Sequence, residues 1–197
     1  MIERLSTICT NRMISENIIS ENEYNYYQYR LLLFIESVVG HSILLIIAFC
    51  CGFVIKTAIF LFAFDLLRGY TNGYHCETNI GCNFLSVFTL LWIRFHEFIF
   101  LEEWDIYQGG VILSMIFIII IGAINHPNMS LSEEEFHAVS RKARIIAVLL
   151  TSLFFILSFC DVERAYLYYL GMGIVQTFIS VVLAKMIMKG GVINAER

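Results

Sequence analysis

Long apolar runs separated by short polar stretches make up most of the chain. The runs cover residues 31–55, 56–67, 84–100, 109–125, 143–160 and 165–188. A transmembrane helix needs about 20 apolar residues, with about 17 as the lower limit, and the last four runs reach that length. We interpret the first two runs together, as two helices that meet at a tight turn between Gly52 and Lys56. The pattern therefore predicts an all-α fold, a polytopic transmembrane helical bundle of about six spans.

The first thirty residues have a different pattern. Leu5, Ile8 and Met13 recur on one face of a predicted helix that also carries charged residues, so the segment is too polar to span a bilayer and suits its surface. Four tyrosines precede the first run, where amphipathic rings favour the membrane interface. We expect residues 1–30 to form an amphipathic N-terminal interfacial segment and 31–197 a transmembrane domain. Simple anchoring explains the segment, and a docking surface for an amphipathic peptide is the alternative.

Composition supports a membrane protein and argues against several other classes. Hydrophobic residues make up 58% of the chain and charged residues 15%, whereas soluble domains average about 45–50% and 25%. The formal net charge of −4 gives no indication of nucleic-acid binding. None of the six cysteines forms a C-x-x-C pair. The spacing therefore indicates neither a disulfide framework nor a zinc site, and we expect no metal and no cofactor.

Charge asymmetry predicts the orientation in the membrane. Basic residues gather near 141–144 and at the C-terminus, whereas the connector 101–108 is acidic. Because Lys and Arg are enriched in cytoplasmic loops, we expect a multi-pass protein of the cell membrane with both termini and the stretch 68–82 facing the cytoplasm. Arg94 fits this scheme less well, and an ion pair with Glu97, three residues later, is one way to accommodate it.

Two local signals predict helix geometry elsewhere. Ser132 and Glu135 have the spacing of a capping box, so we expect a helix to start at Ser132. The "GMG" at 171–173 lacks the third glycine of a dinucleotide fingerprint, and close helix packing is the better explanation.

The polar stretch "RGYTNGYHCETNIGC", residues 68–82, is the candidate for chemistry. Cys82 is a possible nucleophile and His75 its base, because the thiolate attacks and a free thiol has a pKa near ~8.5. In a straight helix the two would lie roughly 10 Å apart along the axis, too far for a hydrogen bond. Thr78 and Asn79 allow a break, and a helix that starts near Asn79 would place Cys82 in its first turn. There the helix dipole favours the thiolate, and backbone N–H groups offer an oxyanion hole.

The residue types alone leave other interpretations open. A polar turn without catalytic function fits the same residues, since a single His–Cys pair is weak evidence. A metal site is less favoured, because His75, Cys76 and Cys82 lack a fourth ligand and a usual spacing. Glu77 follows the histidine by only two positions and is an awkward partner for its imidazole. Asp65 is the other candidate to orient it, although an ion pair between Asp65 and Arg68 would be a simpler role.

The pattern Arg68, Gly73, His75, Cys82 resembles the R-x4-G-x-H-x6-C signature of the accessory gene regulator B (AgrB) family. The resemblance extends over nearly the whole chain, through its length, polar N-terminal segment and multiple spans. It implies an integral-membrane cysteine endopeptidase of quorum sensing. Such an enzyme cleaves the C-terminal part of a small amphipathic, AgrD-like precursor peptide through an acyl-enzyme thioester, and the peptide then cyclises to a thiolactone or lactone.

The resemblance also implies roles for individual residues. Cys82 corresponds to the nucleophile and His75 to the general base and acid. Arg68 and Gly73 match the signature without a defined role, and we expect Arg68 to bind the precursor's carboxylates or its tail. The resemblance also implies that the protein acts as a homodimer. Two rival functions remain: a transporter with a polar pathway through Glu36, His41 and Asp65, and a receptor that binds or exports the peptide without chemistry.

Overall fold

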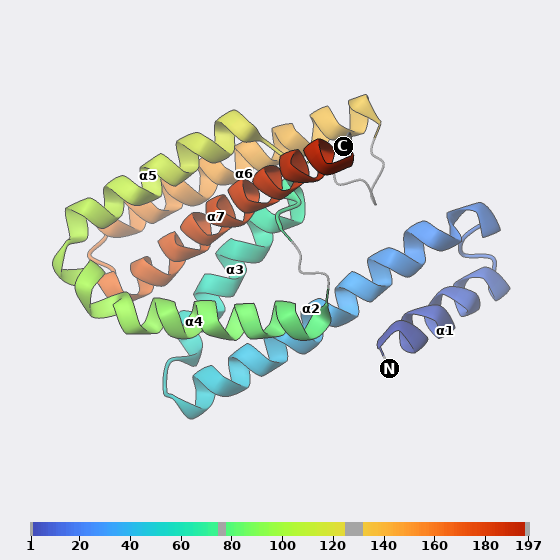
Figure 1. Cartoon of the computed structure of the whole chain (residues 1–197). Coiled ribbons are helices and arrows are strands. Elements are labelled where there is room, and N and C mark those ends of the chain that lie inside the picture. Colours follow the sequence, from blue (N-terminus) through green and yellow to red (C-terminus); the bar gives the residue numbers. More distant parts are fainter. Residues whose placement is uncertain (1, 75–77, 125–131, 196–197) are drawn as a thin grey trace.

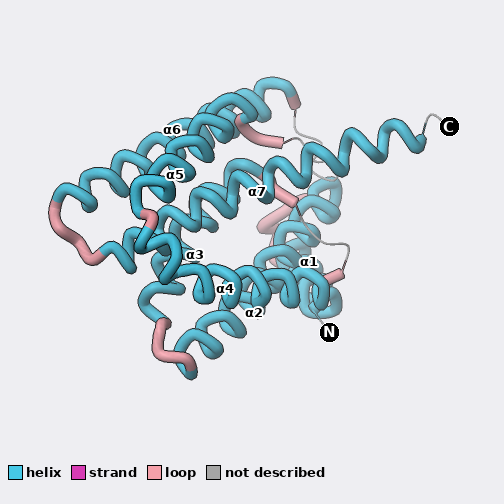
Figure 2. The backbone as a smooth tube through the Cα atoms, turned by 60° about the vertical axis from the view of Figure 1, so that its left-hand side comes forward, coloured by secondary structure: helices cyan, strands magenta, loops and turns pink. Residues whose placement is uncertain are grey.

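The structure is a computed structural model that describes residues 2–74, 78–124 and 132–195, without the side chains of residues 79 and 188–195. The described residues form helices and no strand (Figures 1 and 2). The elements are α1 (Ile2–Ser15), the 3₁₀ helix η1 (Glu21–Glu23), α2 (Tyr24–Cys50), α3 (Val54–Thr71), α4 (Asn79–Glu102), α5 (Trp104–Ile121), α6 (Glu133–Phe159) and α7 (Arg164–Ala195). The predicted all-α fold is confirmed.

Five helices are long and apolar enough to cross a membrane: α2, α4, α5, α6 and α7. The helix α3 has 18 residues but carries Lys56, Asp65 and Arg68, and it does not meet the same standard of apolarity. Its role as a sixth span therefore stays a prediction. The turn between α2 and α3 is where the sequence placed it, because Gly52 lies there with a φ of 76° that favours glycine.

The helix α7 is the centre of the bundle. In its most apolar stretch of 18 residues, 50% of the residues are buried, whereas the corresponding share is 11–28% in the other four candidate spans. A Cβ on Gly173 would lie 2.6 Å from Ala63 Cβ and 3.0 Å from Phe60 O on α3, so glycine lets α7 and α3 touch through their backbones. A Cβ on Gly171 would overlap the Tyr107 hydroxyl of α5. The expected role of the "GMG" in close packing is confirmed.

The helix α1 lies beside α2 at the edge of the bundle (Figure 1). Its buried residues are Ser6 and Thr10, which pack toward α2. Leu5 and Ile8 stay 50% and 55% exposed. These apolar side chains are available for other contacts, and the interfacial role of the segment stays a prediction.

A buried carboxylate connects three helices at the end of the bundle away from α1. Glu97 of α4 is 5% exposed. It pairs with Lys56 Nζ of α3 at 2.6 Å and with Arg94, and it accepts a hydrogen bond from Tyr169 Oη of α7 at 3.2 Å. The predicted Arg94–Glu97 pair is confirmed. The capping box is confirmed as well, because the Ser132 hydroxyl accepts from Glu135 N–H and Ser132 N–H donates to the Glu135 carboxylate.

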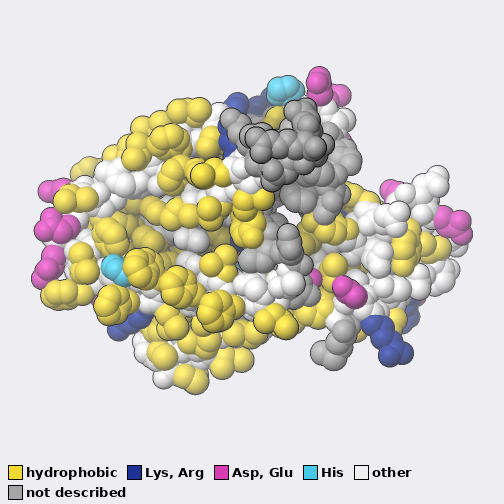
Figure 3. Space-filling view, viewed as in Figure 1, with side chains coloured by type: hydrophobic (Ala, Val, Ile, Leu, Met, Phe, Trp, Pro, Cys, Tyr) yellow, Lys and Arg dark blue, Asp and Glu magenta, His cyan; other side chains and the backbone are white. Residues whose placement is uncertain are grey.

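A broad hydrophobic face covers the bundle, and acidic side chains gather at the end where α4 meets α5 (Figure 3). The exposed apolar side chains of α4 include Phe84, Phe88, Phe95 and Phe98, each more than half exposed. A continuous apolar surface of this kind suits contact with lipid rather than water.

Candidate functional site

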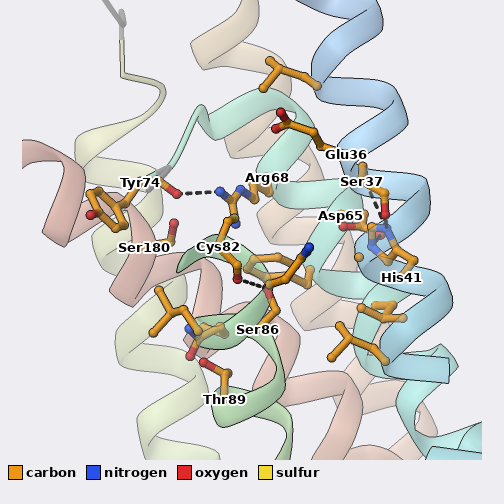
Figure 4. A pocket seen from close by; sticks show the side chains of 18 of the residues that line it. Glu36, Ser37, His41, Asp65, Arg68, Tyr74, Cys82, Ser86, Thr89 and Ser180 are labelled. Atoms are coloured by element: carbon orange, nitrogen blue, oxygen red, sulfur yellow. Dashed lines mark hydrogen bonds and ion pairs between the residues drawn. The ribbon is translucent and has the colours of Figure 1, made fainter. Parts of the chain in front are cut away.

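One cavity brings together the chemistry-bearing residues of four helices. It has a volume of about 170 Å³ and lies between α2, α3, α4 and α7, with Ile2 of α1 at its edge (Figure 4). Its lining includes Glu36, Ser37, His41, Asp65, Arg68, Tyr74, Cys82, Asn83, Ser86, Thr89, Gln176 and Ser180. Apolar side chains such as Leu44, Phe60 and Leu61 complete the wall. The cavity is thus partly polar and partly apolar, as a site for an amphipathic chain would be.

Cys82 lies in the first turn of α4. Thr78 is the N-cap in extended conformation, and its hydroxyl accepts a hydrogen bond from Gly81 N–H at 3.2 Å. Cys82 N–H donates to Thr78 O at 3.0 Å. The predicted helix start near Asn79 is confirmed. Because Thr78 already uses the N–H groups of Gly81 and Cys82, an oxyanion hole in this turn would have to use Asn79 and Ile80.

The chain leaves α3 well before α4 begins. Thr71 is the last residue of α3, and Asn72 follows in the left-handed conformation with a φ of 53°. Asn72 Nδ2 donates to Ile124 O at 3.1 Å, and Ile124 N–H donates to Thr71 O at 2.9 Å. Residues 72–74 therefore do not continue the helix. The break that the sequence analysis required for His75 and Cys82 to meet lies farther along, within residues 76–81, of which Thr78 is extended and caps α4.

Tyr74 is held from two sides. Its carbonyl accepts a hydrogen bond from the Arg68 guanidinium, and its N–H donates to Ser180 O of α7 at 3.1 Å. The same guanidinium lies over the Phe64 ring at 5.2 Å. Phe64 of the same helix therefore orients the Arg68 guanidinium, which holds the segment after α3 through its hydrogen bond to Tyr74.

Asp65 and His41 form an ion pair across the cavity wall. His41 Nε2 of α2 lies 2.7 Å from Asp65 Oδ2 of α3. The sequence allowed an Asp65–Arg68 pair on one helix, but the ion pair in the described residues joins Asp65 to α2. Glu36 lines the same cavity, so the three residues of the hypothetical transport pathway surround Cys82's cavity instead of marking a separate route.

Most of the predicted site residues in the described part of the chain meet here. Cys82, Arg68 and Asp65 line the cavity, and Gly73 lies against Ser180 beside it. His75 and Glu77 lie outside the described residues, as does Cys76, so the predicted His75–Cys82 contact stays a prediction. Within the described residues, no group of three His, Cys, Asp or Glu side chains is placed to hold a metal ion.

The sequence analysis missed the polar residues that complete the cavity. Ser86 and Thr89 follow Cys82 by four and seven positions, so all three lie on one helix face. Gln176 and Ser180 have the same four-residue spacing on α7. Small polar side chains at helical spacing within an apolar run were the available signal, although only the packing of α7 shows that its stripe faces α4.

Comparison with known proteins identifies relatives of the chain. Residues 6–188 match the family model for Accessory gene regulator B. A "Putative AgrB-like protein" of Clostridium perfringens (strain SM101 / Type A) is 27% identical over 95 residues, which is 48% of this chain and 44% of that protein. The alignment thus spans less than half the length of this relative. No solved structure matches the chain.

Proposed function

Since the chain belongs to the accessory gene regulator B family, we propose that it is a membrane cysteine endopeptidase that processes a small AgrD-like precursor peptide. One observation carries the proposal. Cys82 occupies the first turn of a capped helix and lines a cavity that also contains Arg68, so the last and the first residues of the family signature share one site. A bare polar turn would not need to place them around a common cavity.

The proposed reaction has two acyl transfers. The Cys82 thiolate attacks the carbonyl carbon of the scissile peptide bond while His75 holds the thiol proton. The C–N bond then breaks, the leaving amine takes that proton from the imidazolium, and the acyl group stays on sulfur as a thioester. A thiol or hydroxyl within the peptide gives its proton to the imidazole and attacks the thioester carbonyl. The ring closes as the Cys82 thiolate leaves.

The position of the site suits cyclisation better than hydrolysis. A thioester transferred to another thiol conserves the activated acyl group, whereas water would consume it. The cavity walls supply apolar side chains from α2 and α3, which limit the access of water. An amphipathic precursor would concentrate at the membrane surface, where α1 exposes Leu5 and Ile8.

Orientation, assembly and substrate contact belong to the same proposal. The site-bearing end of the bundle faces the cytoplasm of a multi-pass membrane protein, by the distribution of Lys and Arg. The active form is a homodimer, by analogy with the family. Arg68 has a defined contact with Tyr74, so its proposed contact with the precursor's carboxylates must share the guanidinium with that bond.

The test is cleavage of a synthetic precursor by the purified protein in lipid vesicles. We expect Cys82→Ala and His75→Ala each to abolish cleavage, with insertion and assembly unchanged. Mass spectrometry should detect the acyl adduct on Cys82 when the peptide's own ring-closing residue is replaced by Ala. Normal processing by either variant would exclude the peptidase, and a transporter would keep its activity in Cys82→Ser without cutting any precursor.

A further inference from the structure

Gly73 touches α7 where no side chain would fit. A Cβ at Gly73 would overlap the Ser180 hydroxyl and approach Ser180 Cβ to 3.1 Å. The φ of Gly73 is not in the left-handed region, so its backbone alone does not demand glycine. The reason for glycine is therefore the close approach to α7.

Three further contacts fix the next residue. Tyr74 N–H donates to Ser180 O, Tyr74 O accepts from Arg68, and Tyr74 packs against a small apolar cluster of Ile124, Val181 and Ala184. In Figure 4 the Tyr74 carbonyl points toward Arg68 of α3, and Ser180 of α7 lies below Tyr74. We name Arg68, Gly73 and Ser180 the Tyr74 clamp. Arg68 comes from α3, Gly73 from the segment that follows α3, and Ser180 from α7, so the clamp relates the position of α7 to that of α3 at the edge of the cavity.

We infer that the Tyr74 clamp positions the catalytic histidine, with Ser180 of α7 as a positioning residue outside the family signature. Tyr74 is bonded to His75, and consecutive Cα atoms lie about 3.8 Å apart, so the clamp sets the point from which His75 starts. This gives Arg68 and Gly73 a common role in the signature. Arg68 binds the Tyr74 carbonyl, and Gly73, which has no side chain, allows α7 to approach closely. The inference rests on the proposed function.

The close contact between Gly73 and Ser180 matters because the rate of catalysis is sensitive to small displacements of the reacting groups. Catalysis by a thiol and an imidazole requires the two within hydrogen-bond reach, and a misplacement of about 1 Å can cost 10²-fold in rate. A methyl group at Gly73 would overlap the Ser180 hydroxyl, which would have to rotate away, and would lie 3.1 Å from Ser180 Cβ, so that the Gly73 segment or α7 must shift by a few tenths of an ångström. The next atom of Ser180 on that side, its backbone carbon, is 3.5 Å away, at ordinary contact distance. Removing the serine side chain therefore makes room for the methyl group.

This geometry allows a compensation experiment in the full-length protein in lipid vesicles. We expect Gly73→Ala to lower precursor cleavage by at least about tenfold. The double variant Gly73→Ala/Ser180→Gly should recover to within about threefold of Ser180→Gly alone, because the backbone bond to Tyr74 is kept. Gly69→Ala is the matched control, since Gly69 is exposed, has nothing within 4 Å and does not line the cavity. It should cleave as the wild type does.

A second variant and a second readout keep the test decisive. Ser180→Thr enlarges the same contact from the α7 side and should lower cleavage even if Gly73→Ala does not insert. The pH profile of Cys82 alkylation reports the imidazole directly, and in Gly73→Ala it should shift toward that of His75→Ala. Wild-type cleavage by Gly73→Ala, no recovery in the double variant, or an unshifted alkylation profile would each overturn the clamp. A wild-type protein that cuts no precursor would overturn the proposed function instead.

Discussion

His41 Nε2 and Asp65 Oδ2 lie 2.7 Å apart and join α2 to α3 beside the cavity that Cys82 lines. The other ring nitrogen, His41 Nδ1, lies within hydrogen-bond distance of both the hydroxyl and the carbonyl of Ser37. Both ring nitrogens therefore have a neighbouring polar partner, Asp65 at Nε2 and Ser37 at Nδ1. A general base needs a ring nitrogen without a proton, so we expect His41 to serve structure or binding, and the base that we propose is His75.

This relationship predicts unequal effects of the two histidines. We expect His41→Ala to lower precursor cleavage by about tenfold or less, because it loosens the cavity wall but removes no reacting group. His75→Ala should leave no cleavage above background. Steady-state kinetics with one precursor measures both. Equal, complete loss in the two variants would give His41 a part in the chemistry.

Glu97 should be among the most costly single positions for stability. Glu97→Gln leaves Lys56 and Arg94 without their shared anion, and breaking such a buried pair costs about 3–5 kcal/mol. We expect the lower end of that range, because the Arg94 side chain is 47% exposed and solvent screens it. Unfolding in mixed micelles measures the free energy. Glu102→Gln, at an exposed position of the same helix, is the control and should change it by less than about 0.5 kcal/mol.

The stability lost by placing a side chain at Gly173 should be only partly recovered by a second substitution, whereas the activity lost at Gly73 should be recovered. Gly173→Ala forces α7 away from α3 and should destabilise the protein by about 1–3 kcal/mol. Adding Ala63→Gly should recover only part of this loss, because Phe64 N and Phe60 O remain at 2.9 and 3.0 Å and backbone atoms cannot be trimmed. Gly109→Ala, in open space on α5, serves as the control. Full recovery in the double variant would contradict the packing account.

Two native cysteines can establish the orientation. Cys160 lies at the end of α6 and Cys9 in α1, and both are exposed. The helix α1 and the connection from α6 to α7 lie toward opposite ends of the molecule (Figure 1). If the site faces the cytoplasm, a membrane-impermeant maleimide should label Cys160 in intact cells and Cys9 only after lysis. Variants that keep one cysteine each provide the measurement. Labelling of Cys9 in intact cells would place the site on the outer side.

Local signals predicted much of the fold because their causes are local. The capping box at Ser132, the glycine turn at Gly52 and the N-terminal cap at Thr78 depend on residues within four positions. The sequence could not show that Asp65 pairs with His41 rather than with Arg68, since both partners are acceptable by charge. That choice depends on how α2 crosses α3.

By itself the sequence determined the helices, the apolar character of most of them and the short stretch that carries Cys82. Helix formation, apolar burial and capping depend on neighbours along the chain and on the order of residue types. Only the tertiary structure placed Ser180 against Gly73 and put Arg68, Asp65 and Cys82 around one cavity. Those contacts depend on how the helices pack, and one apolar helix face can pack against another in several ways until side-chain volumes and glycine contacts select one.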